Sequence, residues 1–201
     1  MTARGARLSR AFYERPTPVV ARALLGQRLV RVLAGSRLSG LICETEAYGG
    51  PDDESSHAFR RTPRSAIMYG AAGYAYVYYI YGMHYCLNVV TEPDGRPGAV
   101  LIRAIFPQEG VGAMRERRGP RGAARLADGP GKLCRALAID LAQNGLDLAT
   151  DAALFIEAGE AAAAAEVRIT PRIGVRGGAE ARERPWRFVW TPLTAPAAPA
   201  S

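Results

Sequence analysis

The pattern of apolar and polar positions predicts a chain of short secondary-structure elements. Two short helices are predicted first, at residues 8–14 and 17–25. The second helix has Thr17 as its N-cap and Pro18 in its first turn, and Gly26 follows as a stop signal. These signals place a helical segment ahead of the first strand.

Alternation with a period of two predicts a series of strands. They are expected at residues 27–33, 37–47, 74–80, 86–91, 99–106, 154–157, 167–175 and 187–190. Short turn-forming segments such as Ala34-Gly35-Ser36 join the early strands, so consecutive strands form antiparallel hairpins and not βαβ units. The predicted fold class is therefore α+β.

Three further segments interrupt the strand pattern. Residues 52–64 are predicted to form a long polar loop, and residues 115–125, which contain five arginines, a flexible basic loop. A helix capped by Asp128-Gly129-Pro130 is expected to run to about Leu141. Its apolar stripe would consist of Leu133, Leu137 and Leu141.

Length and composition predict a single globular domain. The chain has 201 residues, of which 48% are hydrophobic and 22% are charged, and this is enough for a real core. We expect one domain over residues 1–192 and a disordered tail over residues 193–201. No apolar run is long enough for a membrane span or fits a secretory signal. Three widely spaced cysteines indicate reduced thiols and a cytoplasmic location.

Charge adds information about the partner. The formal net charge is +7, and Lys132 is the only lysine among the 26 basic residues. This balance favours nucleic acid before membrane as a partner. Arg60, Arg61, Arg64 and the arginines of residues 115–125 suit phosphate groups, although charge runs are usually solvated faces. The predicted helix start near Lys132 adds free backbone N–H groups that can hold a phosphate.

The stretch from Leu41 to Arg103 carries the candidate chemistry. Strand alternation places Glu44, Glu46 and Tyr48 on one face, together with Ile42. A carboxylate close to aromatic rings is partly desolvated, becomes a stronger base and can take a proton from water. A carboxylate on an exposed edge strand explains Glu46 equally well from the pattern alone, and Glu44 is a rival for the role.

Seven of the nine tyrosines lie between Tyr69 and Tyr85, and no Phe occurs there. A strand rich in aromatic residues usually belongs to the hydrophobic core. Tyrosine, however, is favoured where its hydroxyl end contacts water, which points to a binding surface for a flat ring. His57 follows Asp52-Asp53-Glu54 closely. These residues are conceivable metal ligands, but a solvated acidic loop is the simpler interpretation.

Several short motifs occur in a fixed order over residues 11–190. They are Glu44-Thr45-Glu46-Ala47-Tyr48, Pro51-Asp52-Asp53-Glu54 leading to His57, Thr62-Pro63-Arg64, Tyr76-Val77-Tyr78-Tyr79-Ile80-Tyr81-Gly82-Met83, Cys86-Leu87-Asn88, Leu101-Ile102-Arg103-Ala104, Gly129-Pro130-Gly131-Lys132-Leu133-Cys134 and Pro171-Arg172-Ile173-Gly174-Val175. In this order the chain resembles the alkyladenine (3-methyladenine) DNA glycosylases of the mammalian type. The resemblance implies a single compact α+β domain with a curved antiparallel sheet flanked by helices.

The resemblance also implies a function. It implies a monofunctional DNA glycosylase of base excision repair, which flips an alkylated or deaminated purine out of the duplex and hydrolyses its bond to the sugar. The expected lesions are of the 3-methyladenine, hypoxanthine and ethenoadenine class, and the product is an abasic site. The implied partner is damaged double-stranded DNA. We expect a monomer, no cofactor or metal, and a location in the bacterial cytoplasm and nucleoid, or in a eukaryotic nucleus.

The resemblance implies a role for each residue of this chain that occupies a functional position in one of the motifs. Glu46 would be the general base for the attacking water, with Arg103 beside that water. The base pocket would consist of Tyr48, His57, Tyr78 and Asn88, with Tyr76 as a support. Tyr81 would wedge into the gap that the flipped base leaves. The DNA backbone would be held by Arg64, Lys132, Arg115, Arg117 and Arg118.

The residues also bear on lyase activity and leave two alternative functions open. A lyase needs an amine for a Schiff base, and Lys132 stands where a phosphate contact is expected, so we expect no lyase activity. A catalytically silent nucleic-acid-binding module on the same fold remains an alternative. A metal-dependent nuclease that uses the acidic loop and His57 is a second alternative.

Overall fold

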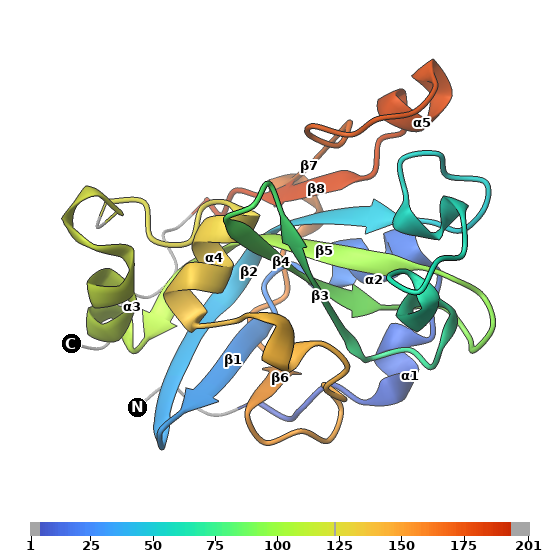
Figure 1. Ribbon diagram of the computed structural model, residues 1–201. Coiled ribbons are helices and arrows are strands. Elements are labelled where there is room, and N and C mark those ends of the chain that lie inside the picture. Colours follow the sequence, from blue (N-terminus) through green and yellow to red (C-terminus); the bar gives the residue numbers. More distant parts are fainter. Residues whose placement is uncertain (1–4, 123, 194–201) are drawn as a thin grey trace.

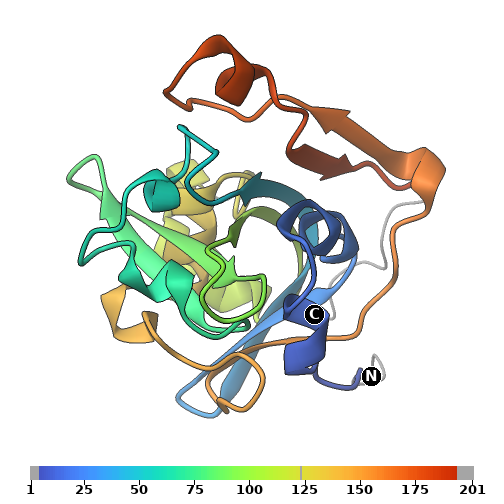
Figure 2. The same cartoon turned by 90° about the vertical axis from the view of Figure 1, so that its right-hand side faces the viewer.

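The computed structural model describes residues 5–122 and 124–193, and its centre is a sheet of eight strands. The strands are β1 (Arg28–Leu33), β2 (Ser36–Tyr48), β3 (Ala75–Ile80), β4 (His84–Val90), β5 (Ala99–Glu109), β6 (Leu154–Glu157), β7 (Val167–Thr170) and β8 (Arg187–Trp190). Their order is β3-β4-β5-β2-β1-β6, while β8 pairs with β2 and β7. Every strand pairing in this part of the chain is antiparallel, and the sheet curves around the core (Figure 2).

Helices lie on both sides of this sheet. They are α1 (Arg10–Tyr13), α2 (Thr17–Ala23), α3 (Val111–Arg118), α4 (Pro130–Leu137) and α5 (Ala179–Glu183). Figure 1 shows α4 in front of the sheet, against β4 and β5, and α2 behind it, against β2 and β5. The predicted α+β class and antiparallel sheet are confirmed. Among the described helices, none has the length and apolar character to cross a membrane.

Strand β2 is the central element. It pairs with β5 along most of its length, with β1 at one end and with β8 around Glu44 to Glu46. Between Ile42 and Thr45 the register with β5 shifts twice, and the pairing skips Cys43 on β2 and Arg103 on β5. Such β-bulges interrupt the alternation of side chains and redirect them. The irregularity therefore falls where the candidate charged residues meet.

The hairpin from β3 to β4 ends in the predicted turn. Tyr81 has φ 54° and Gly82 has φ 67°, so both lie in the left-handed region. A residue with a Cβ is disfavoured there by about 1–2 kcal/mol. The turn leaves the Tyr81 side chain 76% exposed. Its position at a tip is confirmed, at a cost in local backbone strain.

The prediction of a flexible basic loop at residues 115–125 was wrong in its first part. Arg115, Arg117 and Arg118 belong to α3, which begins after Gly110 and ends at Gly119. Arg, Glu, Met and Ala are good helix formers, and the helix buries Val111 and Met114 against its neighbours. Gly and Pro end the helix, and Pro120–Gly122 form a 3₁₀ turn.

Two helix boundaries also differ from the prediction. Helix α4 ends at Leu137, because Ala138 adopts a left-handed conformation with φ 51°. Leu133 and Leu137 are buried as expected, whereas Leu141 lies on a separate 3₁₀ turn and is 54% exposed. The N-cap of this helix is Gly129, within the predicted capping segment, and the carboxylate of Asp128 pairs with Lys132 and Arg125.

Pro16 and not Thr17 is the N-cap of α2. The Thr17 hydroxyl instead donates a hydrogen bond of 2.8 Å to Glu92, which ties the helix to the end of β4. This tertiary contact replaces the local cap that the sequence predicts.

The strand predicted at residues 167–175 ends at Thr170. Pro171 has no N–H for the ladder, so β7 stops there. The following segment, residues 171–178, turns toward β2 and reaches the candidate site. Of the tail predicted to be disordered at residues 193–201, only Leu193 falls within the described residues, and it is exposed.

Candidate active site

A cavity of about 530 Å³ opens between the β3–β4 hairpin, the segment after β2 and the segment after β7. Its volume is in the range of small-molecule pockets in proteins. The sequence-predicted residues that line it are Tyr48, His57, Tyr76, Tyr78, Tyr81, Asn88 and Arg103. The fold thus brings together side chains from four strands, a hairpin tip and a loop.

Glu46 lies behind the pocket wall with no exposed surface. One carboxylate oxygen, Oε2, accepts hydrogen bonds from the Tyr48 hydroxyl at 2.8 Å and from Arg103 Nη1 at 3.1 Å. The other oxygen, Oε1, accepts one from the backbone N–H of Ile173 at 2.7 Å. These donors come from β2, β5 and the segment after β7, so the carboxylate is fixed by three parts of the fold.

Arg103 connects Glu46 with the rival carboxylate Glu44. Its Nε donates to Glu44 Oε1 at 2.7 Å, and Arg187 Nε donates to the same oxygen at 2.7 Å. Desolvation disfavours the charged guanidinium, but the negative charges of Glu46 and Glu44 outweigh it and raise the pKa of Arg103. Glu44 is thus held between two arginines, whereas Glu46 borders two pocket residues, Tyr48 and Arg103.

His57, Tyr76 and Tyr78 form an aromatic wall of the pocket. His57 Nδ1 is 2.8 Å from the Tyr76 hydroxyl, and its ring meets Tyr78 edge-on with centroids 4.7 Å apart. Desolvation and the positive charge of Arg64 lower the pKa of His57 from 6.5 to about 4, although part of its surface is exposed. Its imidazole is therefore neutral near pH 7 and offers an uncharged face.

Tyr48 stands at another side of the pocket. Burial, reinforced by the charge of Glu46, raises the pKa of Tyr48 well above its usual value, so the phenol stays protonated and donates to that carboxylate. Behind the ring, the guanidinium carbon of Arg172 is 4.8 Å from the ring centroid. The ring is therefore held by its hydroxyl and by one of its faces.

Two further predicted residues hold fixed positions at the pocket. The Asn88 side-chain amide is buried and donates to the Tyr76 carbonyl at 3.0 Å. Arg64 places its guanidinium carbon 4.6 Å from the Tyr78 ring centroid and donates to the Tyr79 carbonyl at 3.4 Å. Arg64 therefore adds positive charge beside the aromatic wall.

The residues predicted to contact the DNA backbone, Arg64 included, lie outside the pocket lining. Lys132 Nζ donates to Asp128 at 2.9 Å. Arg117 Nη1 donates to the Ala136 carbonyl at 3.2 Å, and Arg135 Nε donates to the Arg117 carbonyl at 2.8 Å. Arg117 thus joins α3 to α4, and its side chain has a structural contact.

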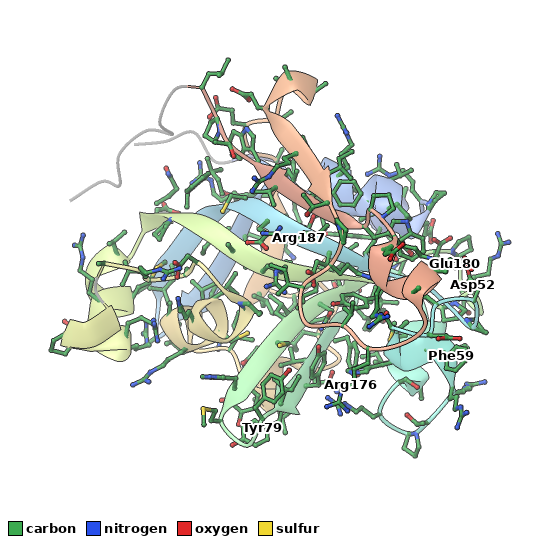
Figure 3. All side chains as sticks on the ribbon, turned by 90° about the horizontal axis from the view of Figure 1, so that it is seen from above. Asp52, Phe59, Tyr79, Arg176, Glu180 and Arg187 are labelled. Atoms are coloured by element: carbon green, nitrogen blue, oxygen red, sulfur yellow. The ribbon has the colours of Figure 1, made fainter. Side chains whose placement is uncertain are left out.

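The sequence did not indicate that residues 171–178 belong to the site, and part of this segment was predicted to be a strand. Ile173, Gly174, Val175 and Arg176 all line the cavity. Figure 3 shows Arg176 between the hairpin end marked by Tyr79 and the loop marked by Phe59. The signal available in the sequence is Pro171, which ends a strand, followed by Gly174; in the structure Gly174 has φ 69°.

The acidic loop does not assemble as a metal site. Asp53 is paired with the buried Arg172, Asp52 faces Arg184, and Glu54 accepts the N–H of Gly178. Within residues 5–122 and 124–193, no group of three or more His, Cys, Asp or Glu side chains is arranged to hold a metal ion. The geometry therefore gives no support to the nuclease alternative.

The fold and the pocket together define a class of protein: a single α+β domain in which a buried carboxylate borders an aromatic pocket large enough for a flat ring. The sequence model of one protein family, described as methylpurine-DNA glycosylase, matches residues 11–192 of the chain. The curated relatives that match the chain include three that carry the name "Putative 3-methyladenine DNA glycosylase". The one from Desulfitobacterium hafniense is 44% identical, covering 90% of this chain and 94% of the relative.

The relative from Methanocella arvoryzae is 49% identical and covers 90% of each chain. The relative from Bacillus cytotoxicus is 48% identical and covers 88% of this chain and 92% of its own. The chain belongs to the methylpurine-DNA glycosylase family, and its activity is that of a DNA glycosylase. The resemblance drawn from the ordered motifs is confirmed.

Proposed function

We propose that this protein excises alkylated or deaminated purines from double-stranded DNA in base excision repair and leaves an abasic site. The lesions are of the 3-methyladenine, hypoxanthine and ethenoadenine class. The observation that carries the proposal is the Glu46 carboxylate, fixed by three hydrogen-bond donors beside an aromatic pocket of about 530 Å³. A purine reaches such a pocket only when it is flipped out of the duplex, which is easiest for bases that pair or stack poorly.

The hydrogen bonds of Glu46 leave it able to act as a general base. An ionised carboxylate offers about four acceptor positions, and three are occupied here. A water molecule at the remaining position transfers its proton to Glu46 as its oxygen attacks the sugar carbon. The bond between the sugar carbon and the base nitrogen breaks, and its electron pair leaves with the base, so that a positively charged alkylpurine departs as a neutral molecule. The negative charge of Glu46 stabilises the oxocarbenium-like transition state. Arg103 orients the carboxylate and the water.

The pocket walls supply recognition. Tyr48 on one side and His57 with Tyr78 on the other stack on the flipped base, a contact worth about 1–3 kcal/mol per base. The aromatic faces favour positively charged alkylpurines through cation–π attraction, and the neutral imidazole of His57 adds no repulsion. The fixed amide of Asn88 crowds the amino group of guanine and so disfavours the normal base.

The rim of the pocket holds the DNA. Tyr81, exposed at the hairpin tip, fills the gap that the flipped base leaves. Phosphate contacts come from Arg64, Lys132, Arg115 and Arg118, with Arg117 as a weaker candidate because of its structural contact. Arg176 is added to this group because it is exposed at the pocket. We expect the protein to act as a monomer where DNA is held, in the bacterial cytoplasm or in a nucleus.

Base release in the presence of a chelator tests the proposal. Duplexes with a single hypoxanthine or ethenoadenine, and methylated DNA as a source of 3-methyladenine, are incubated with the protein in EDTA. Free base is measured by chromatography, with an undamaged duplex as the control. Release from at least one damaged DNA is expected. Binding without release would identify a silent binding module, and strand cutting that EDTA abolishes would identify a metal-dependent nuclease.

The same reactions test for lyase activity. Lys132 is paired with Asp128 and lies outside the pocket lining, so no Schiff base with the abasic sugar is expected. Strands should therefore break only after alkaline treatment. A covalent protein–DNA product trapped by borohydride would overturn this part of the proposal.

A further inference from the structure

Two charged side chains next to the pocket are completely buried and paired with each other. Arg172 and Asp53 both have side chains with 0% exposure. Arg172 Nη1 donates to Asp53 Oδ2 at 2.6 Å, and Nη2 donates to Oδ1 at 2.8 Å, so the pair is bidentate. Burying two charges carries a large desolvation cost, so such a pair is weak evidence for stability by itself. Its contacts indicate a different role.

Arg172 also binds the backbone on two sides. Nη1 donates to the carbonyl of Ala47 at 2.9 Å, which lies on β2 between Glu46 and Tyr48. Nη2 donates to the carbonyl of Ala181 on α5 at 2.7 Å. The planar guanidinium lies 4.8 Å from the centroid of the Tyr48 ring. One side chain thus fixes β2, α5 and an aromatic wall of the pocket.

Asp53 extends the same unit into the loop after β2. Its carboxylate accepts the N–H of Gly49 at 2.9 Å and the N–H of Ser55 at 3.2 Å. Ser55 in turn donates through Oγ to the carbonyl of Arg176 at 2.6 Å. The segment after β7 is therefore held against this loop at Arg172 and again at Arg176.

The residue after Arg172 reaches the catalytic carboxylate. The N–H of Ile173 donates to Glu46 Oε1 at 2.7 Å, while Tyr48, which stacks on Arg172, donates to Oε2 at 2.8 Å. The positions of two of the three donors on Glu46, the Ile173 N–H and the Tyr48 hydroxyl, thus depend on the contacts of Arg172. The side chain of Ile173 is itself 51% exposed, so its backbone position is not set by burial in the core.

We infer that the Arg172–Asp53 pair is a positioning device for the proposed reaction, which aligns the Ile173 N–H and the Tyr48 hydroxyl on Glu46. The inference rests on the proposed function of Glu46 as the base. Arg172 and Asp53 are positioning residues, because they act on the reacting groups through Ile173 and Tyr48. Lysine cannot replace Arg172 fully, since a point charge cannot bind the carboxylate with two parallel bonds and both carbonyls at once.

The test separates chemistry from binding and from folding. Arg172→Gln, Asp53→Asn and the double variant are compared in single-turnover excision at saturating protein, on whichever lesion the wild type releases. Rates are normalised to the active fraction, and affinity is measured on a duplex with a tetrahydrofuran abasic analogue. Each single variant is expected to lose about 10–100-fold in rate, the cost seen when the outer hydrogen-bond partners of metal ligands are removed. Affinity should change little, and the double variant should be no slower than the slower single variant.

Arg184→Gln is the matched control. Arg184 also stacks on Trp186, as Arg172 does, and pairs with Asp52 and Glu180, but the described structure gives it no contact with Glu46, Tyr48 or Ile173. Its single-turnover rate should stay at the wild-type level. A rate per active molecule that is unchanged in Arg172→Gln would overturn the inference, because a purely stabilising role lowers only the active fraction.

A second pair of variants covers the case in which the buried substitutions do not fold. Ile173→Pro removes the N–H that reaches Glu46, and Ile173→Ala keeps it. The proline variant should be much slower than the alanine variant, because only the alanine variant retains this N–H, while equal rates in the two would overturn the inference. A different result would be that the wild-type protein releases no base from any of the lesions. That result would refute the proposed function, and the inference with it.

Discussion

Glu46 and Glu44 share a strand and nearly the same neighbours, yet the structure separates them. Glu46 has no exposed surface and borders Tyr48 and Arg103 of the pocket, whereas Glu44 shares one oxygen between Arg103 and Arg187. Strand periodicity left the two equivalent. The difference comes from Ile173 and Arg187, which approach from distant parts of the chain.

Substitution of each glutamate checks this distinction. Glu46→Gln keeps the shape and the pocket but removes the base, so excision should fall by at least about 100-fold while binding of damaged DNA persists. Glu44→Gln keeps an oxygen for the two arginines and should lose much less. Single-turnover rates and the affinity for an abasic-analogue duplex give the comparison. Full activity of Glu46→Gln would refute its assignment as the base.

The lowered pKa of His57 makes a prediction about pH. In the unfolded chain His57 takes up a proton near pH 6.5, but in the folded protein only near pH 4. Between these values the unfolded state binds more protons, so stability falls as the pH drops from 6.5 to 4 and is unaffected above that window. The melting temperature of the wild type should therefore fall more steeply across this window than that of His57→Gln. Parallel pH profiles would contradict the prediction.

Seven of the residues that line the pocket were predicted from the sequence, and for most of them the reason is local. Tyr48, Tyr76, Tyr78 and Asn88 lie on strands, where a period of two and a motif match place each side chain on the correct face. The buried pair Asp53–Arg172 was missed because its members are 119 residues apart in the chain. Nothing near either residue indicates that they meet.

At the scale of elements, the β3–β4 hairpin is the part of the site that the sequence predicted best. Its alternating tyrosines send Tyr76 and Tyr78 toward the pocket, while Tyr79 packs against Tyr85 with ring centroids 5.1 Å apart. The turn at Tyr81-Gly82 then carries an exposed ring at the tip. A strained conformation of a large residue at a tip indicates a role for its side chain.

Tyr81→Asn tests this role without changing the turn. Asn tolerates the left-handed conformation, so the melting temperature should stay close to that of the wild type. Loss of the ring should weaken the preference for damaged over undamaged duplex and reduce flipping. A 2-aminopurine beside the lesion reports flipping by fluorescence. Tyr79→Ala, on the opposite face of the same hairpin, is the control and should keep both properties; equal losses in the two variants would argue against the wedge.

The β2–β5 pairing could not be predicted in detail. Alternation along residues 37–47 indicates a regular strand, but the register with β5 skips Cys43 and Arg103. These bulges form only when two strands meet, because the extra residue on one strand is defined by its partner. Arg103 reaches both Glu44 and Glu46 at this irregularity.

On the scale of the whole molecule, net charge and its placement make a prediction about DNA affinity. The chain carries a net charge of +7, and α3 contributes Arg115 from outside the pocket. Removing one phosphate contact should reduce the slope of log K against log salt by about 1. Arg115→Ala should show this change, measured by fluorescence anisotropy across a salt series.

Arg22→Ala is the matched control for this measurement. Arg22 lies on α2, behind the sheet in Figure 1, and its removal lowers the net charge equally. The salt slope of this variant should match that of the wild type. Equal reductions in the two variants would mean that overall charge, and not a specific contact by α3, governs binding.

The sequence alone determined the α+β class, the antiparallel strands, the family and several of the pocket residues on the strands. These depend on local alternation, turn chemistry and motif order, which neighbouring residues specify. The tertiary structure alone decided which glutamate borders the pocket, where the strands bulge, and that the segment after β7 returns to place Arg172 and Ile173 at the site. Those features depend on contacts between residues far apart in the chain, and the free energy of such contacts exists only once the chain is folded.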